Sequence, residues 1–143
     1  MQIIGFSFSK ISGYKSKKAK LNQTNINIDF LDIQEEESQV LKIPTVRVSF
    51  MFTVSYEGED KNLKAGEILY EGDIVISATE SEIKDISKAW KKKELPTGFR
   101  VPIFNFILQR CSIKALNMEE DLQLPTHIPL PTLRPQKSEE KVN

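Results

Sequence analysis

The sequence predicts an α+β fold, in which a four-stranded antiparallel sheet is followed by two C-terminal helices. Apolar and polar residues alternate in four segments, at residues 2–11, 25–30, 45–56 and 68–76. A period of two is typical of strands with one buried face. A capping box then begins at Thr79, and beyond it the apolar residues follow the helical period of 3.6.

The strand expected over residues 45–56 is the centre of this prediction. Its even positions are all β-branched or aromatic: Val46, Val48, Phe50, Phe52, Val54 and Tyr56. The intervening positions are mostly polar, so one face should be buried and the other solvated. A strand cannot keep such a face dry alone. Other strands must therefore pair beside it, and a further layer must cover the apolar face.

Two shorter strands should precede this one. Residues 2–11 carry apolar side chains on one side, at Ile4, Phe6 and Phe8. Residues 25–30 alternate in the same way. The next segment, residues 31–43, has no clean period, and we interpret it as a long crossover or loop that bears exposed apolar residues.

The fourth strand, residues 68–76, repeats the even-face pattern with Gly72 at its middle. A glycine inside a strand favours a bend or a bulge, so we expect one there. We also expect the first and fourth strands to be the open edges of the sheet, which leaves hydrogen-bonding groups free for another chain.

The first helix should begin at Thr79, because Thr79 and Glu82 fit a capping box. One face of it is apolar and should pack on the sheet, with Trp90 as a core anchor. Pro96 and Gly98 should end this helix.

The second helix should open near Pro102 and run to about Asn117, since proline is favoured in a first turn. Its apolar positions form two rows: Phe104, Ile107, Leu108, Cys111 and Ala115, and then Ile103, Phe106 and Ile113. Such a helix is covered on two sides, by its own sheet and by either a partner subunit or a ligand. Four prolines in residues 125–135 then impose an extended path. We expect one domain over residues 1–135 and a disordered tail over residues 136–143.

Charge and composition exclude several classes of function. The 20 basic and 20 acidic residues balance, so no global field attracts nucleic acid or an anionic membrane. Cys111 and His127 are each the only residue of their kind, which excludes an internal disulfide and a multi-ligand zinc site. No apolar run is long enough for a signal peptide or a membrane span, so we expect a cytoplasmic protein.

Catalysis has little support in the sequence. Cys111 falls in the apolar row of the second helix, His127 lies between prolines, and neither has an indicated partner. The glycines never come at phosphate-loop spacing. We therefore expect no enzymatic activity, no cofactor and no metal. A basic turn at residues 15–20 could touch nucleic acid, but edge protection and solvation explain it better.

The order of these elements is similar to that of SecB-like export chaperones. The resemblance covers residues 2–131 and is most specific at residues 105–111 and in the apolar, proline-bearing segment from Leu122. It implies a homotetramer made of two dimers that join sheets edge to edge. It also implies apolar grooves that hold unfolded client proteins without ATP.

The chain departs from better-known members of that family in two respects. It ends in residues 137–143, KSEEKVN, where those members have a basic, glycine-rich tail that docks a zinc element of the export motor. It is also neutral, whereas typical members are acidic. These departures favour a solitary member, or one dedicated to a single client such as an antitoxin.

The expected client-binding residues are apolar and lie in three places: the crossover, the outer row of the second helix and the segment after it. They are Leu31, Ile33, Val40, Leu41, Phe106, Ile113, Leu122, Leu124, Ile128 and Leu130. A single small domain rarely has so many large apolar residues outside its main stripe unless it shares a surface. The alternative is a structural or assembly module, in which the same residues only close the core or build an oligomer.

Overall fold

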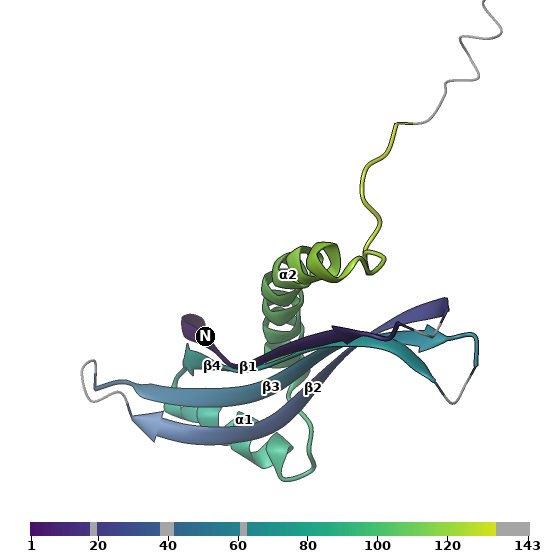
Figure 1. The fold of residues 1–143 in the computed structure, drawn as a ribbon. Coiled ribbons are helices and arrows are strands. Elements are labelled where there is room, and N and C mark those ends of the chain that lie inside the picture. The colour runs from purple at the N-terminus through teal and green to yellow at the C-terminus, as the bar shows by residue number, and fades with distance from the viewer. Residues whose placement is uncertain (18–19, 38–41, 61–62, 134–143) are drawn as a thin grey trace, which may run out of the picture.

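The computed structural model describes residues 1–17, 20–37, 42–60 and 63–133. It confirms the predicted α+β class, a four-stranded antiparallel sheet followed by two helices (Figure 1). In chain order the elements are β1 (Gln2–Lys15), β2 (Leu21–Glu37), β3 (Pro44–Gly58), β4 (Lys64–Ser77), α1 (Glu80–Trp90) and α2 (Thr97–Leu122). The tail expected at residues 136–143 lies outside the described residues.

The strand order is β1-β4-β3-β2, and all neighbours are antiparallel. The even positions of β3 and β4 are buried, which confirms the prediction for the central strand. The prediction was correct for the first strand as an edge and wrong for the fourth. β4 lies inside the sheet between β1 and β3, so the two edges are β1 and β2.

The crossover expected at residues 31–43 is instead largely strand, because β2 pairs with β3 as far as Glu37. A register shift between Phe30 and Asp32 makes Leu31 a bulged residue. Phe30 lies opposite Phe50 and Ile33 opposite Val48, so both face the helices although three positions separate them. The bulge therefore interrupts the two-residue alternation of apolar side chains by which a strand is recognised in a sequence.

One row of residues crosses all four strands: Phe8, Gly72, Phe50 and Phe30. Directly after this row both edge strands shift register, at Ser9 and at Leu31. A Cβ at Gly72 would lie 2.3 Å from the carbonyl oxygen of Ser7 and 3.0 Å from the Phe50 ring. The irregularity expected at Gly72 thus lies in its neighbour β1, while β4 and β3 stay in register through the glycine.

A second bulge in β1 corrects the predicted alternation at the N-terminus. The register shifts between Ile3 and Gly5, so Ile3 packs against the core and Ile4 is exposed. Phe6 and Phe8 do face the core, as expected, and Phe6 stacks on Phe50 with ring centroids 5.6 Å apart.

Helix α1 begins with the predicted capping box: the Thr79 hydroxyl accepts from the Glu82 N–H at 3.2 Å. Ile83 and Ile86 are its buried residues. Trp90 is not the expected core anchor, because it is only half-buried and the Lys93 ammonium lies 4.8 Å from its ring centroid.

Helix α2 begins at Thr97, ahead of Pro102, and ends at Leu122 rather than near Asn117. The N–H groups of Phe99 and Arg100 both donate to the Pro96 carbonyl at 2.9 Å, so Pro96 marks the start. Its buried stripe begins with Ile103 and continues through Ile107, Cys111 and Ala115, and Phe104 lies outside it.

Candidate functional site: an apolar groove between α2 and β2

Exposed apolar side chains gather where α2 lies beside the edge strand β2. A pocket of about 390 Å³ lies at the middle of this strand. Ile28 and Phe30 of β2 line one side of it, and Arg100, Val101, Phe104 and Asn105 of α2 line the other. Most of its lining is apolar, and the Arg100 guanidinium and the Asn105 amide are its polar groups.

A second pocket, of about 610 Å³, lies where β2 begins and α2 ends. Its apolar lining comes from Leu21 of β2, Leu116 of α2, and Leu124, Pro125 and Leu130 of the segment that follows α2. The polar residues around it include Asn117, Glu120 and Gln123. It is larger than the pocket at the middle of β2.

The register of the sheet places these two pockets on the same face. Leu21, Ile26 and Ile28 lie opposite Gly58, Val54 and Phe52, which are even positions of β3 and so face the helices. Ile26 therefore lies between the two pockets. We call this surface the α2–β2 groove, with the residues Leu21, Ile26, Ile28, Phe30, Val101, Phe104, Leu116 and Leu130.

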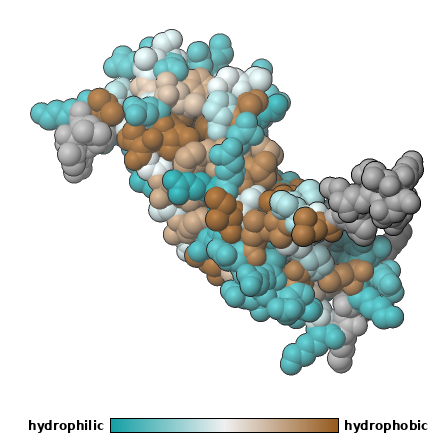
Figure 2. All heavy atoms as spheres, turned by 90° about the horizontal axis from the view of Figure 1, so that it is seen from above, coloured by the Kyte–Doolittle hydropathy of each residue, from teal (hydrophilic) through white to brown (hydrophobic). Residues whose placement is uncertain are grey.

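The groove is open to solvent. Five of its residues are between 36% and 51% exposed: Leu21, Ile26, Val101, Phe104 and Leu130. Apolar patches separated by hydrophilic residues appear on the face of the molecule shown in Figure 2. Exposed apolar surface that is rimmed by polar residues marks binding sites in soluble proteins. Such a surface suits an extended apolar segment, because hydrophobic burial is non-directional.

The structure does not bring all of the predicted site residues together. In β2, Leu31 is exposed at a bulge, and Ile33 packs against the core. Neither lines the groove. Val40 and Leu41 lie outside the described residues.

On α2, the predicted outer row lies on the side toward β1, away from the groove. Phe106 contacts Phe6 of β1, with ring centroids 5.5 Å apart. Ile113, two turns further on, is 65% exposed and lines no pocket among the described residues. Leu122 packs against the core, beside the position where a Cβ on Gly13 would point.

The segment after α2 does contribute to the groove. Leu124 is buried and lines the larger pocket, and Leu130 lines it while remaining half exposed. Ile128 is half-buried and does not line that pocket. Two of the ten predicted residues, Leu124 and Leu130, are thus found at the groove.

The sequence interpretation missed the helix side of the groove. The apolar row predicted for the helix includes Phe104, because it stands three residues before Ile107, and a helix start near Pro102 leaves Val101 before the helix. Burial of Ile103 and Ile107 leaves Phe104 beside the stripe. The available signal was Pro96, which precedes the helix and indicates a start one residue later.

A buried polar cluster lies at the end of the groove and was also missed. The Tyr56 hydroxyl donates to Glu119 Oε2, and His127 Nδ1 lies 2.8 Å from Glu119 Oε1. The Tyr56 oxygen also lies 3.2 Å from the Pro125 carbonyl oxygen. The side chains of Glu119 and His127 are fully buried. No described polar atom lies within hydrogen-bonding distance of His127 Nε2.

Burial favours the neutral form of Tyr56 and of two titratable groups nearby, Tyr70 and Cys111. It is the main cause that raises the pKa of the Tyr56 hydroxyl, and the hydrogen bond to the Glu119 carboxylate raises this pKa further. Burial likewise raises the pKa of Tyr70 to about 12 and that of the Cys111 thiol to about 12. A thiol that stays protonated is a poor nucleophile, which agrees with the predicted structural role of Cys111.

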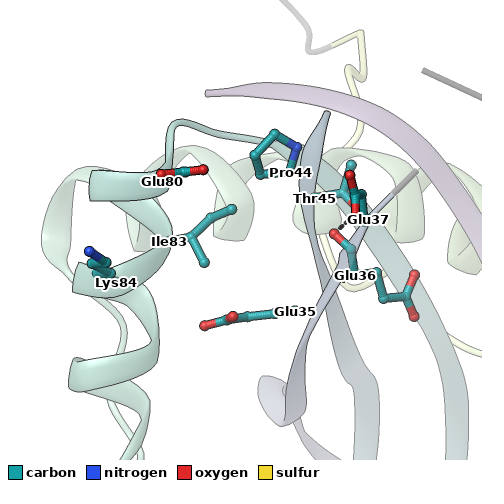
Figure 3. Close-up of a pocket in the computed structure, with 8 residues that line it drawn as sticks. All are labelled: Glu35, Glu36, Glu37, Pro44, Thr45, Glu80, Ile83 and Lys84. Atoms are coloured by element: carbon teal, nitrogen blue, oxygen red, sulfur yellow. Dashed lines mark hydrogen bonds between the residues drawn. The ribbon is translucent and has the colours of Figure 1, made fainter. Parts of the chain in front are cut away.

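An acidic pocket lies at the other end of the sheet, and two of its glutamates are bonded to neighbouring elements (Figure 3). In Figure 3, α1 lies beside the last residues of β2, and Ile83 extends into the space between them. Glu35 accepts a hydrogen bond from Ser87 of α1, and the Arg47 guanidinium lies 2.9 Å from Glu36 Oε1. These contacts attach α1 and β3 to the edge strand. Among the described residues, no group of His, Cys, Asp and Glu side chains could hold a metal ion.

Comparisons with known proteins define the class of fold. No protein-family model matches this sequence, and no curated protein matches it. The structure is similar to that of the SecB-like chaperone Rv1957 of Mycobacterium tuberculosis, solved in complex with a ChAD peptide from the Rv1956 HigA1 antitoxin. The match has a TM-score of 0.58 and 11% sequence identity, and it covers 94% of this chain and 92% of the other.

The chain therefore has a SecB-like fold, as the order of its elements predicted. Across the described part of the chain, no helix is long and apolar enough to cross a membrane.

Proposed function

We propose that this protein is an ATP-independent chaperone that binds non-native polypeptides in the α2–β2 groove. The observation that carries the proposal is the gathering of exposed apolar residues along one side of α2, where β2 supplies the opposite wall. The SecB-like fold supports it, because the similar chaperone was solved with a peptide bound. No catalytic step is part of this function.

The physics of the groove fits unfolded chains better than one defined ligand. Its described lining consists mainly of aliphatic and phenylalanine side chains, which impose little directional recognition. Burying apolar surface contributes roughly 25 cal/mol per Å² before the cost of ordering the bound chain. Affinity should therefore depend on the apolar content of the client segment and tolerate changes in its sequence.

The assembly that we propose is a homotetramer of two dimers. β1 and β2 are the free edges of the sheet, and a free edge offers N–H and C=O groups to another strand. The exposed apolar residues on the β1 side, Ile11 and Ile113, could pack between copies. A cytoplasmic location agrees with the single buried and unpaired cysteine.

The client that we propose is either a general set of unfolded export proteins or one dedicated protein such as an antitoxin. The second agrees with the antitoxin peptide bound by the similar chaperone. Binding assays with each kind of client would separate these two cases.

Suppression of aggregation tests the function directly. A chemically denatured test protein is diluted into buffer with or without this protein, in the absence of ATP, and light scattering is followed. We expect scattering to fall as the chaperone concentration rises. Oligomerisation without any suppression would support the alternative of a structural module, and salt-sensitive retention on RNA or DNA would support nucleic-acid binding.

A further inference from the structure

The chain passes over the end of the groove after α2 ends. Gln123 caps the helix in the left-handed conformation, with φ 56° and ψ 40°, and the Leu124 N–H donates to the Glu119 carbonyl at 2.8 Å. Residues 125–130, which we call the strap, follow directly. Three residues of the strap, Pro125, Thr126 and Leu130, line the larger pocket of the groove.

The strap has few apolar contacts that could hold it in place. Pro125, Thr126, Pro129 and Leu130 are exposed, and in Figure 1 residues 131–133 extend away from the sheet. Ile128 is half-buried, and His127 is the most deeply held residue of the strap, because its side chain is fully buried and its ring contacts Phe52, with centroids 6.3 Å apart.

His127 is held by a carboxylate that is itself buried. Both oxygens of Glu119 have hydrogen-bond partners: Oε2 accepts from the Tyr56 hydroxyl of β3, and Oε1 lies 2.8 Å from His127 Nδ1 of the strap. A buried carboxylate without these donors would be costly, since ionised groups lose strong hydration. The same Tyr56 hydroxyl lies 3.2 Å from the Pro125 carbonyl oxygen. Side chains of β3 and α2 therefore both make hydrogen-bonding contacts with the strap.

We propose that Tyr56, Glu119 and His127 form a latch that seats the strap as the end wall of the α2–β2 groove. The latch thereby completes the larger pocket, so that the groove can hold the far end of a long apolar peptide. The three residues are positioning residues, since they act through Pro125, Thr126 and Leu130. This inference rests on the proposed function, because it concerns the same groove.

Peptide length is the readout that separates a latch from a general contribution to stability. The β2 segment from Leu21 to Phe30 contributes Leu21 to the larger pocket and Ile28 and Phe30 to the other, and it spans about 30 Å at roughly 3.3 Å per residue. A peptide of about ten extended residues reaches both pockets, whereas one of about five residues fills only the pocket at Val101 and Phe104. Only the longer peptide should sense the strap.

The experiment uses fluorescent peptides of alternating leucine and serine, about five and about ten residues long. Their dissociation constants are measured for the full chain and for the variants Tyr56→Phe and His127→Leu. Tyr70→Phe is the matched control, because it makes the same chemical change on the neighbouring strand, where the hydroxyl contacts only the Met118 sulfur at 4.0 Å. Reaction of Cys111 with a thiol reagent monitors unfolding, since this cysteine is buried in the core.

The latch predicts that both variants bind the longer peptide roughly tenfold more weakly, by about 1.4 kcal/mol. Binding of the shorter peptide and the behaviour of Tyr70→Phe should not change, and Cys111 should stay largely protected in both variants because they remain folded. Equal weakening for both lengths, no weakening, or tighter binding of the longer peptide would overturn the latch. Failure of the unmodified protein to bind either peptide would instead overturn the proposed function on which the latch rests.

Discussion

Glu119 shows how one residue can connect three segments of a small domain. Its carboxylate has no exposure to solvent, and its two oxygens take their donors from β3 and from the strap. Removing one donor would leave a buried charge short of a partner, which costs more than the hydrogen bond itself contributes.

The first prediction at this scale concerns Tyr56→Phe, which keeps the buried ring and removes its hydroxyl. Because Glu119 loses a donor, we expect the free energy of unfolding to fall by about 1.5–3 kcal/mol. Urea unfolding measures this change. The control Tyr70→Phe should cost less than about 1 kcal/mol, because that hydroxyl makes only a weak contact with sulfur. Equal losses would show that Glu119 does not depend on Tyr56.

The second prediction concerns alkaline pH. Burial raises the pKa of the Cys111 thiol from 9.0 to about 12 in the folded chain, so above pH 9 the unfolded state gives up the proton first. The contribution of Cys111 to the free energy of unfolding should be constant below pH 9 and should decrease as the pH rises toward 12. In Cys111→Ala this decrease, measured by urea unfolding at several pH values, should be shallower. The same slope in both proteins would contradict the raised pKa.

At the level of single residues, the sequence predicted the burial of Cys111 but not the buried contact of His127. Cys111 stands in a helical apolar row, and a period of 3.6 over several turns is a strong local signal. The partner of His127 is eight residues earlier, on a helix that was expected to end before Glu119. No local pattern reports a contact that forms only when the chain leaves a helix and returns to a sheet.

Among the elements, the edge strands are the irregular ones. β1 shifts register twice against β4, and β2 shifts twice against β3, whereas β3 and β4 stay in register until Tyr56. Bulges increase the local twist and make an edge a poorer template for uncontrolled pairing. The Phe8–Gly72–Phe50–Phe30 row is where both edges shift together.

A prediction at this scale compares two glycine substitutions. Gly72→Ala should destabilise the domain by several kcal/mol, because its Cβ would lie 2.3 Å from a backbone oxygen that cannot move independently. Gly98→Ala should stabilise it by about 0.5–1 kcal/mol, since nothing lies within 4 Å and alanine favours the helix. Melting temperatures of the two variants check the pair. A mild effect at Gly72 would show that β1 does not approach it closely.

The regular elements are also the ones that the sequence predicted correctly. The period of β3 and β4 and the capping box of α1 were all recovered, because each is a local and uninterrupted pattern. β2 was cut short at its bulge, and the helix side of the groove was lost with the misplaced start of α2. Pairing with a long neighbour fixed the length of β2, and that constraint is not local in sequence.

For the whole molecule, the two free edges and the apolar residues outside the groove predict an oligomer. Light scattering at micromolar concentration should give a mass near four times 16.4 kDa. Replacing Ile11, an exposed residue of the β1 edge strand, with lysine should shift the mass downward if β1 forms an interface. A mass of one chain for the unmodified protein would contradict the proposed assembly.

The central claim is that the α2–β2 groove captures unfolded chains, and its most direct test is the affinity for a denatured client protein. The double variant Val101→Ser and Phe104→Ser removes two exposed groove residues without entering the buried stripe. Ile113→Ser is the matched control, since it removes an exposed apolar residue of the same helix outside the groove. We predict that the double variant binds at least about tenfold more weakly and that the control binds like the unmodified protein. Equal affinity of all three proteins, with their folds intact, would contradict the claim.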